Sequence, residues 1–119
     1  MARSKYRSQQ TIVDGKKFPS KLEATRYKQL ILMQTAGVIS GLKLQVEFVI
    51  NQAYIDALTG EKMRAVVYIA DFVYFDHDTK RKIVEDTKGV ETAVFKNKWR
   101  QCRELYPEYE WRIVKRSEV

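Results

Sequence analysis

The chain has 119 residues, of which 45% are hydrophobic and 31% are charged, and its formal net charge is +7. This length and composition are typical of one globular domain, and they exclude both a disordered chain and a pair of domains. The excess of lysine and arginine favours a polyanionic partner such as nucleic acid, although charge alone indicates no mechanism.

The first segment, residues 1–17, is basic and has no apolar stretch of the kind that a secretory signal needs. We expect a flexible basic arm here, followed by a single folded domain over residues 18–119. Lys16 and Lys17 are candidate nucleic-acid contacts in this arm, and the alternative is a disordered tail.

Residues 18–37 predict the first helix. Ser20 is a good N-cap, Glu23 stands three residues later as in a capping box, and Gly37 is a plausible C-cap. Tyr27 lies one turn after Glu23, so the helical spacing places both side chains on the same face.

The rest of the chain predicts three strands, a second helix and a final strand. Strands are expected at about 42–50, over 53–75 as a hairpin with its turn at 58–61, over 81–88 and at about 110–115, and the helix at about 92–106. The helix carries a buried stripe of Phe95, Trp99, Cys102 and Tyr106. The order α-β-β-β-α-β predicts an α/β (α+β) fold with a mixed sheet flanked by helices, because the last strand follows a helical crossover.

Two features indicate the setting of the protein. The longest apolar run is close to LILM at 30–33, whereas a membrane span needs about 20 such residues, so no membrane contact is expected. Cys102 is the only cysteine, which excludes an intramolecular disulfide and a cysteine-based zinc site and favours a cytoplasmic location.

Charged residues interrupt segments that should be apolar. Asp71 lies inside the run YIADFVYF. On the strand at 81–88, Asp86 and Lys88 alternate with Val84, so the side chains of Val84, Asp86 and Lys88 point to one side of that strand. Glu23 lies on the inner face of the first helix. A buried lone carboxylate costs several kcal/mol unless it is paired or bound to a metal, so carboxylates that gather near one lysine favour a shared cation.

Phosphodiester hydrolysis is the chemistry that uses such a set. Two carboxylates from adjacent strands can fix Mg²⁺ (or Mn²⁺), a hard cation that prefers oxygen ligands. The metal polarises the phosphate and lowers the pKa of a bound water. Lys88, two residues after Asp86, projects to the same side, where it can position the water or neutralise developing charge.

The pattern Asp71, then Asp86-x-Lys88, resembles the D…(D/E)-x-K signature of the PD-(D/E)XK nuclease superfamily. Glu23 resembles the extra helical carboxylate of many members, including Holliday-junction resolvases and transposon-end nucleases. The strings GKKFPSKLEATRY, LQVEF and ADFVYFDHDTKRKIVEDTKG are similar to a family of small phage-encoded proteins of unassigned function within that superfamily. The likeness covers roughly residues 15–110, and it departs from the signature at Ala70, where a proline is usual.

The resemblance implies a restriction-endonuclease-like core and Mg²⁺-dependent DNA cleavage. It implies that Asp71 and Asp86 bind the metal, that Lys88 serves the water and the transition state, that Glu23 completes the site, and that Gln45 is a polar neighbour. Small basic resolvases of this superfamily act on branched DNA as dimers, so junction DNA and a homodimer are the corresponding expectations.

Each of these residues also has a structural interpretation. The role of Glu23 can be limited to the capping box, with no part in catalysis. Asp71 can be a strand-edge carboxylate paired with Arg64, Arg81 or Lys82. Asp86 and Lys88 can form an exposed ion pair worth under about 1 kcal/mol.

Three other sets of charged residues are interpreted separately. Glu85 should point away from Asp86 as a structural charge partner, and His77 is expected in a turn. On the second helix Lys96, Arg100 and Arg103 are either phosphate contacts or a solvated face.

The sequence thus predicts a metal-dependent DNA endonuclease of duplex or branched DNA. Two other classes stay open. One is a nucleic-acid-binding module that does not cleave, and the other is a subunit of a phage replication or packaging complex.

Overall fold

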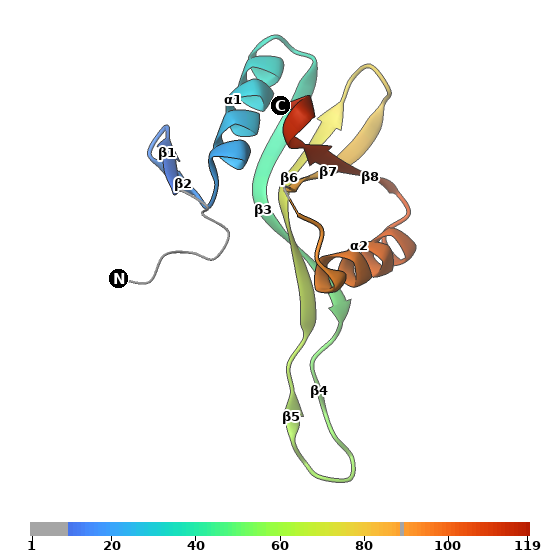
Figure 1. Ribbon diagram of the computed structural model, residues 1–119. Coiled ribbons are helices and arrows are strands. Elements are labelled where there is room, and N and C mark those ends of the chain that lie inside the picture. The colour runs from blue at the N-terminus through green and yellow to red at the C-terminus, as the bar shows by residue number, and fades with distance from the viewer. Residues whose placement is uncertain (1–9, 89) are drawn as a thin grey trace, which may run out of the picture.

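A four-stranded mixed sheet with helices packed on its two faces forms the body of the structure (Figure 1). The computed structural model describes residues 10–88 and 90–119. Its elements in chain order are β1 (Thr11–Val13), β2 (Lys16–Phe18), α1 (Lys21–Thr35), β3 (Ile39–Asn51), β4 (Tyr54–Ile55), β5 (Lys62–Met63), β6 (Val66–Asp76), β7 (Arg81–Lys88), α2 (Ala93–Leu105), β8 (Tyr109–Lys115) and a 3-10 turn η1 (Arg116–Glu118).

The strand order in the sheet is β3-β6-β7-β8. The first two pairs are antiparallel, and β7 and β8 are parallel because the chain returns between them through α2. The sequence prediction of an α+β protein with a mixed sheet and two flanking helices is therefore confirmed. The strand predicted at about 42–50 is shorter than β3, which begins at Ile39 and ends at Asn51.

Two apolar clusters, one on each face of the sheet, hold the helices in place. The α1 cluster consists of Phe18, Ala24, Tyr27, Leu30, Ile39, Phe72, Tyr74 and Ile83. The α2 cluster consists of Phe48, Ile50, Tyr68, Ala70, Val84, Phe95, Trp99 and Cys102. Ile83 and Val84 are neighbours in β7 and belong to different clusters, as the alternation of a strand buried on both faces requires.

The helix α1 begins as the sequence predicts. The Ser20 side chain accepts a hydrogen bond from the backbone N–H of Glu23 at 3.1 Å, which satisfies one of the free amides of the first turn. Leu30 is fully buried against the sheet. The helix ends before Gly37, whose φ of +80° lies in the left-handed region that favours glycine.

The helix α2 also follows its prediction. Thr92 caps it by accepting from the N–H of Phe95, and the buried side chains are Phe95, Trp99 and Cys102. Tyr106 packs beside them and donates its hydroxyl to the carbonyl of Val49 at 2.7 Å. Within residues 10–88 and 90–119, no helix combines the length and apolarity needed to cross a membrane.

The N-terminal segment differs from the prediction of a flexible arm over residues 1–17. Strands β1 and β2 form a hairpin, joined at Asp14 and Gly15, whose φ values of 51° and 75° are both positive as a type I′ turn requires. Phe18 at the end of the hairpin is buried in the α1 cluster. Residues 11–17 are therefore folded, and residues 1–9 lie outside the described part of the chain.

The two longest strands change the face that they present near their midpoints. In β6, Ala70 packs in the α2 cluster and Phe72 in the α1 cluster, although strand alternation should place them on one face. In β3, Leu44 packs against the α1 cluster and Val46 against the α2 cluster. The change in β3 falls at Gln45, whose φ of 52° is unusual for a non-glycine residue.

Beyond the sheet, β3 and β6 continue as a two-stranded arm, defined here as residues 51–66. Tyr54 pairs with Met63 and Ile55 with Lys62. The arm projects away from the body and from both helices (Figure 1). The predicted hairpin turn at 58–61 lies at its tip.

Candidate functional site

The carboxylates predicted to act together lie where two central strands separate. The β6–β7 ladder runs from the pair Asp76–Arg81 to the pair Phe72–Glu85. Asp71 and Asp86 are the next residues on the two strands. Backbone groups at such a fork lose their ladder partners, so side chains must satisfy them.

Asp86 is the most deeply buried member of the site, with 1% of its surface exposed. The Tyr68 hydroxyl donates to its Oδ2, and Lys88 Nζ lies 3.5 Å from the same oxygen. Its other oxygen, Oδ1, is buried and has no hydrogen-bond partner. Burial raises the pKa of Asp86 to about 6, and the charge of Lys88 opposes that rise.

Lys88 points from the end of β7 toward the first turn of α2. Its Nζ lies 4.5 Å from the centroid of the Phe95 ring, which is close enough for a cation–π interaction. The side chain keeps 29% of its surface exposed. Its ammonium group is therefore fixed beside Asp86 and open to solvent on one side.

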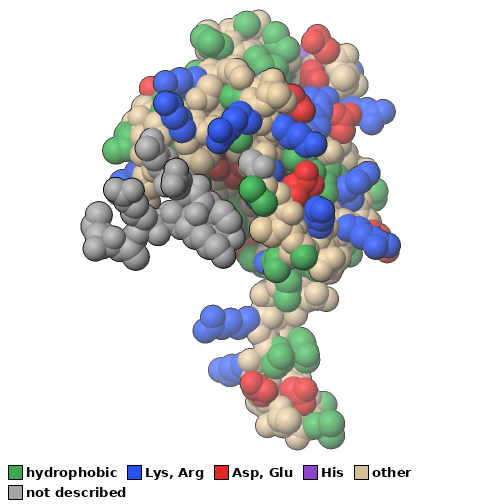
Figure 2. All heavy atoms as spheres, viewed as in Figure 1, with side chains coloured by type: hydrophobic (Ala, Val, Ile, Leu, Met, Phe, Trp, Pro, Cys, Tyr) green, Lys and Arg blue, Asp and Glu red, His purple; other side chains and the backbone are tan. Residues whose placement is uncertain are grey.

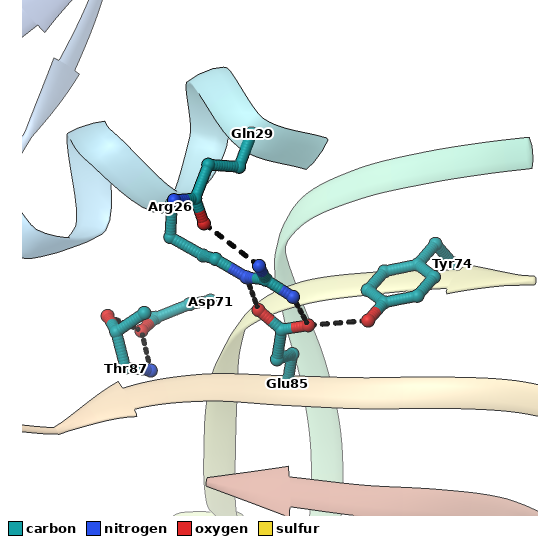
Figure 3. A network of polar contacts seen from close by, with 6 residues as sticks. All are labelled: Arg26, Gln29, Asp71, Tyr74, Glu85 and Thr87. Carbon is teal, nitrogen blue, oxygen red and sulfur yellow. Dashed lines mark hydrogen bonds and ion pairs between the residues drawn. The ribbon is translucent and has the colours of Figure 1, made fainter. Parts of the chain in front are cut away.

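Asp71, on β6, accepts hydrogen bonds from β7 just beyond the point where the two strands separate. Its Oδ2 accepts two hydrogen bonds of 2.9 Å, from the backbone N–H and from the hydroxyl of Thr87 (Figure 3). Of the partners that the structural interpretation assigned to it, Arg81 pairs with Glu110 and Lys82 lies over the Tyr109 ring. Asp71 thus belongs to the fork and not to an exposed ion pair.

Glu23 reaches the site from α1 and is 3% exposed. Its Oε2 accepts from Gln45 Nε2 at 3.3 Å. Its pKa is raised to about 9, first by burial, then by the charge of Asp71 and a hydrogen bond with it, and then by Asp86. The backbone of Glu23 serves the helix cap, while its carboxyl group faces the other two carboxylates.

Glu85 lies on the opposite face of β7, as alternation predicts. It is fully buried and accepts from Arg26 Nε at 2.6 Å and Arg26 Nη2 at 3.0 Å, with the Tyr74 hydroxyl as a further donor (Figure 3). Gln29 holds the same guanidinium through Nη1 at 2.9 Å. This network is a structural anchor between α1 and the sheet.

The donor set fits a hard divalent cation in its chemistry. Carboxylate oxygens are the ligands that Mg²⁺ prefers, and the unpartnered Oδ1 of Asp86 is a buried acceptor that a cation would satisfy. As the side chains lie, no three carboxylate, histidine or cysteine residues within 10–88 and 90–119 are arranged to hold a metal. Holding an ion therefore requires the carboxyl groups to rotate and Glu23 to release its proton.

The remaining predicted contacts lie outside this cluster, on the surface. Lys16 and Lys17 are exposed in β2, where Lys16 Nζ lies 5.5 Å from the Tyr27 ring centroid. On α2, Lys96, Arg100 and Arg103 are exposed. Figure 2 shows lysine and arginine side chains spread over the body on one face.

His77 occupies the turn after β6, where the sequence placed it. Its Nε2 lies 2.9 Å from the Ser40 hydroxyl, and its ring packs on Phe75 with centroids 5.0 Å apart. It is exposed. Its contacts stabilise the turn, and none of them is to the carboxylate cluster. Gly89, which follows the strand predicted over 81–88 and is a residue type that ends strands, lies outside the described residues.

Three residues of the site were not predicted from the sequence. Thr87 holds Asp71, Tyr68 holds Asp86, and Phe95 supports Lys88. Thr87 could have been predicted as a site residue, because it has a side-chain hydroxyl and lies between two predicted site residues at a strand end. Tyr68 could not, since simple alternation from Asp71 places it on the other face of β6.

The fold and this cluster define a class: an α+β protein with a mixed four-stranded sheet that brings three carboxylates and a lysine together at a strand fork, with Glu23 and Asp86 buried. Residues 3–118 match the family described as "Protein of unknown function (DUF1064)". The match spans nearly the whole chain, so the protein belongs to this family. No curated protein and no solved structure matches it.

Proposed function

We propose that the protein is a metal-dependent DNA endonuclease of the PD-(D/E)XK type. The observation that carries the proposal is the convergence of Glu23, Asp71 and Asp86 beside Lys88, with one buried oxygen of Asp86 unpartnered. A structural role alone gives little reason to gather three carboxyl groups of which two are buried, because burying Glu23 and Asp86 opposes their ionisation and so costs stability at neutral pH. A site that stabilises a cation gives such a reason.

The residues of the candidate site would have different roles in cleavage. Asp71, Asp86 and Glu23 would hold Mg²⁺ or Mn²⁺, which when bound polarises the scissile phosphate and lowers the pKa of a water. Lys88 Nζ, fixed between Asp86 and the Phe95 ring, is the donor available to the attacking water and to charge on the phosphate. Tyr68 fixes the orientation of the Asp86 carboxylate.

Exposed basic residues would hold the DNA backbone. The candidates are Lys16, Lys17, Lys96, Arg100 and Arg103, all of which are exposed. Contacts of this kind give little sequence preference and make binding weaken steeply with salt. Duplex and branched DNA both satisfy such a surface, and junction DNA is the substrate that the resemblance favours.

Nicking of supercoiled plasmid tests the proposal. The wild type should nick with Mg²⁺ or Mn²⁺ and not with EDTA, and Asp86→Asn should lose at least about a hundredfold in rate. Asp78→Asn, in the exposed turn after β6, is the matched control and should cleave like the wild type. Equal cleavage by the wild type and Asp86→Asn would contradict the proposal. Linear duplex, single strand, flap and four-way junction then define the substrate.

A module that binds nucleic acid without cleaving it is the second candidate. The observation that favours it is that Oδ2 of Asp86 is already occupied by Tyr68 and Lys88, with no three-ligand metal set formed among the described residues. Salt-dependent DNA binding with no cleavage of any substrate in Mg²⁺ or Mn²⁺ would select it.

A further inference from the structure

The arm, residues 51–66, carries a concentration of exposed apolar side chains that the nuclease site does not explain. Leu58 at the tip is 99% exposed, Ile55 66% and Tyr54 57%, and Val66 at the base is also exposed. Two-stranded hairpins in water are marginally stable by themselves. Apolar residues gathered on such an element indicate that another surface covers it.

The tip is built to present Leu58. Asp56 accepts from the N–H groups of Leu58 and Thr59 at 2.9 and 3.0 Å, and the Asp56 N–H donates to the Glu61 carbonyl at 2.8 Å. Gly60, with φ of 72°, closes the turn. The leucine is thus held out on an ordered turn, so its burial by a partner would cost little conformational entropy.

A shallow hollow lies at the other end of the arm. It is lined by Asn51, Gln52, Tyr54, Met63, Arg64 and Val66. The arm therefore has an apolar projection at its tip and a partly apolar recess near its base. Two copies that lie antiparallel along their arms would place each projection against the recess of the other, as a two-fold axis requires.

The charges of the arm favour the same partner. Its acidic residues, Asp56 and Glu61, lie at the tip, while its basic residues, Lys62 and Arg64, follow toward the base, and Figure 2 shows this separation. The arm is neutral on a chain of net charge +7. DNA would favour a basic arm, whereas an antiparallel second copy places acidic tip against basic stem.

We infer that the arm is a dimerisation element, in which two copies of this chain pair antiparallel, with Leu58 of each seated in the hollow lined by Tyr54, Met63 and Arg64 of the other. The inference is independent of cleavage, because it rests on the arm alone.

Sedimentation equilibrium across a series of protein concentrations tests the apolar contact. The wild type should be a dimer, and Leu58→Ser should raise the dissociation constant about tenfold or more. Leu105→Ser, at an exposed leucine on α2, is the matched control and should leave the constant unchanged. A monomeric wild type, or equal dissociation constants for Leu58→Ser and the wild type, would overturn the inference.

Charge exchange tests the antiparallel arrangement. Glu61→Lys and Arg64→Glu should each weaken the dimer severalfold, because each brings like charges together at both ends of the interface. An equimolar mixture of the two variants restores opposite charges at both ends and should associate as the wild type does. A mixture that associates no better than either variant alone would overturn the antiparallel pairing, and circular dichroism confirms that all variants fold.

Discussion

Arg26 Nε lies 2.6 Å from Oε1 of Glu85, and Arg26 Nη2 donates to Oε2 of the same carboxylate at 3.0 Å. Arg26 stands one helical turn after Glu23 in α1, and Glu85 immediately precedes Asp86 in β7. This pair, in which Glu85 is fully buried and Arg26 is partly exposed, therefore docks the helix on the sheet at the point where each carries a site carboxylate. The position of Glu23 over the fork depends on it.

Removing the guanidinium should be strongly destabilising. Arg26→Met leaves the fully buried carboxyl group of Glu85 without its cation, and we expect a loss of about 3–5 kcal/mol in the free energy of unfolding. Arg26→Lys keeps the charge but not the two parallel bonds, so its loss should be smaller. Urea denaturation measures both. A loss under about 1 kcal/mol for Arg26→Met would contradict this role for the pair.

Asp86→Asn should separate activity from stability. The substitution removes a buried charge whose Oδ1 has no partner, so in EDTA at neutral pH the variant should be at least as stable as the wild type. Cleavage should be lost at the same time. Urea denaturation in EDTA measures the first effect and plasmid nicking the second. If Asp86 were only a structural partner of Tyr68 and Lys88, the variant would be less stable instead.

The metal-free protein should lose stability as pH rises. The pKa of Asp86 is raised to about 6 and that of Glu23 to about 9, so over this range the folded state holds protons that the unfolded state has released. The free energy of unfolding then falls with pH, from about pH 4.5 up to about pH 9. Glu23→Gln should flatten the fall above pH 6. Denaturation in EDTA across this range measures it, and a wild-type stability that rises between about pH 6 and about pH 9 would contradict the assignment.

Mg²⁺ should reverse this loss. A cation that binds the ionised carboxylates stabilises the folded state by mass action, so the melting temperature should rise with Mg²⁺ concentration. The rise should be larger at about pH 8 than at about pH 6, because binding must displace the protons on Glu23 and Asp86. Asp86→Asn should show little of it. Differential scanning calorimetry makes the measurement, and identical shifts for variant and wild type would place the ion elsewhere.

The parts of the fold predicted from sequence are those that depend on local chemistry. Ser20 and Glu23 start α1 because a hydroxyl caps free amides, and the spacing of Phe95, Trp99 and Cys102 marks the buried side of α2. Asp86 and Lys88 share a side of β7 because strand alternation has a period of two. The N-terminal hairpin was also within reach, since Asp14-Gly15 between two β-favouring runs is a strong turn signal. The basic residues on both sides of this turn, in contrast, favour a flexible arm.

What the sequence does not contain is the change of face in β3 and β6. The amino-acid sequence does not indicate that Gln45 adopts a positive φ, because glutamine has no preference for that backbone conformation. That change brings Tyr68 to the Asp86 side of the sheet while Asp71 turns to Thr87 and Glu23. The members of the site could therefore be named individually, while their hydrogen-bond partners depended on a tertiary distortion.

Gln45 offers a direct test of that distortion. A β-branched side chain is strained at a φ of 52°, so Gln45→Val should lower the free energy of unfolding by about 1–3 kcal/mol. Gln45→Gly accepts the same backbone geometry and loses only the hydrogen bond to Glu23, so it should stay within about 1 kcal/mol of the wild type. Glu47→Val, at an exposed position of the same strand, is the control and should be nearly neutral. Urea denaturation compares the three. Equal losses for the valine and glycine variants would show that the backbone at Gln45 is not strained, and the face change would then need another cause.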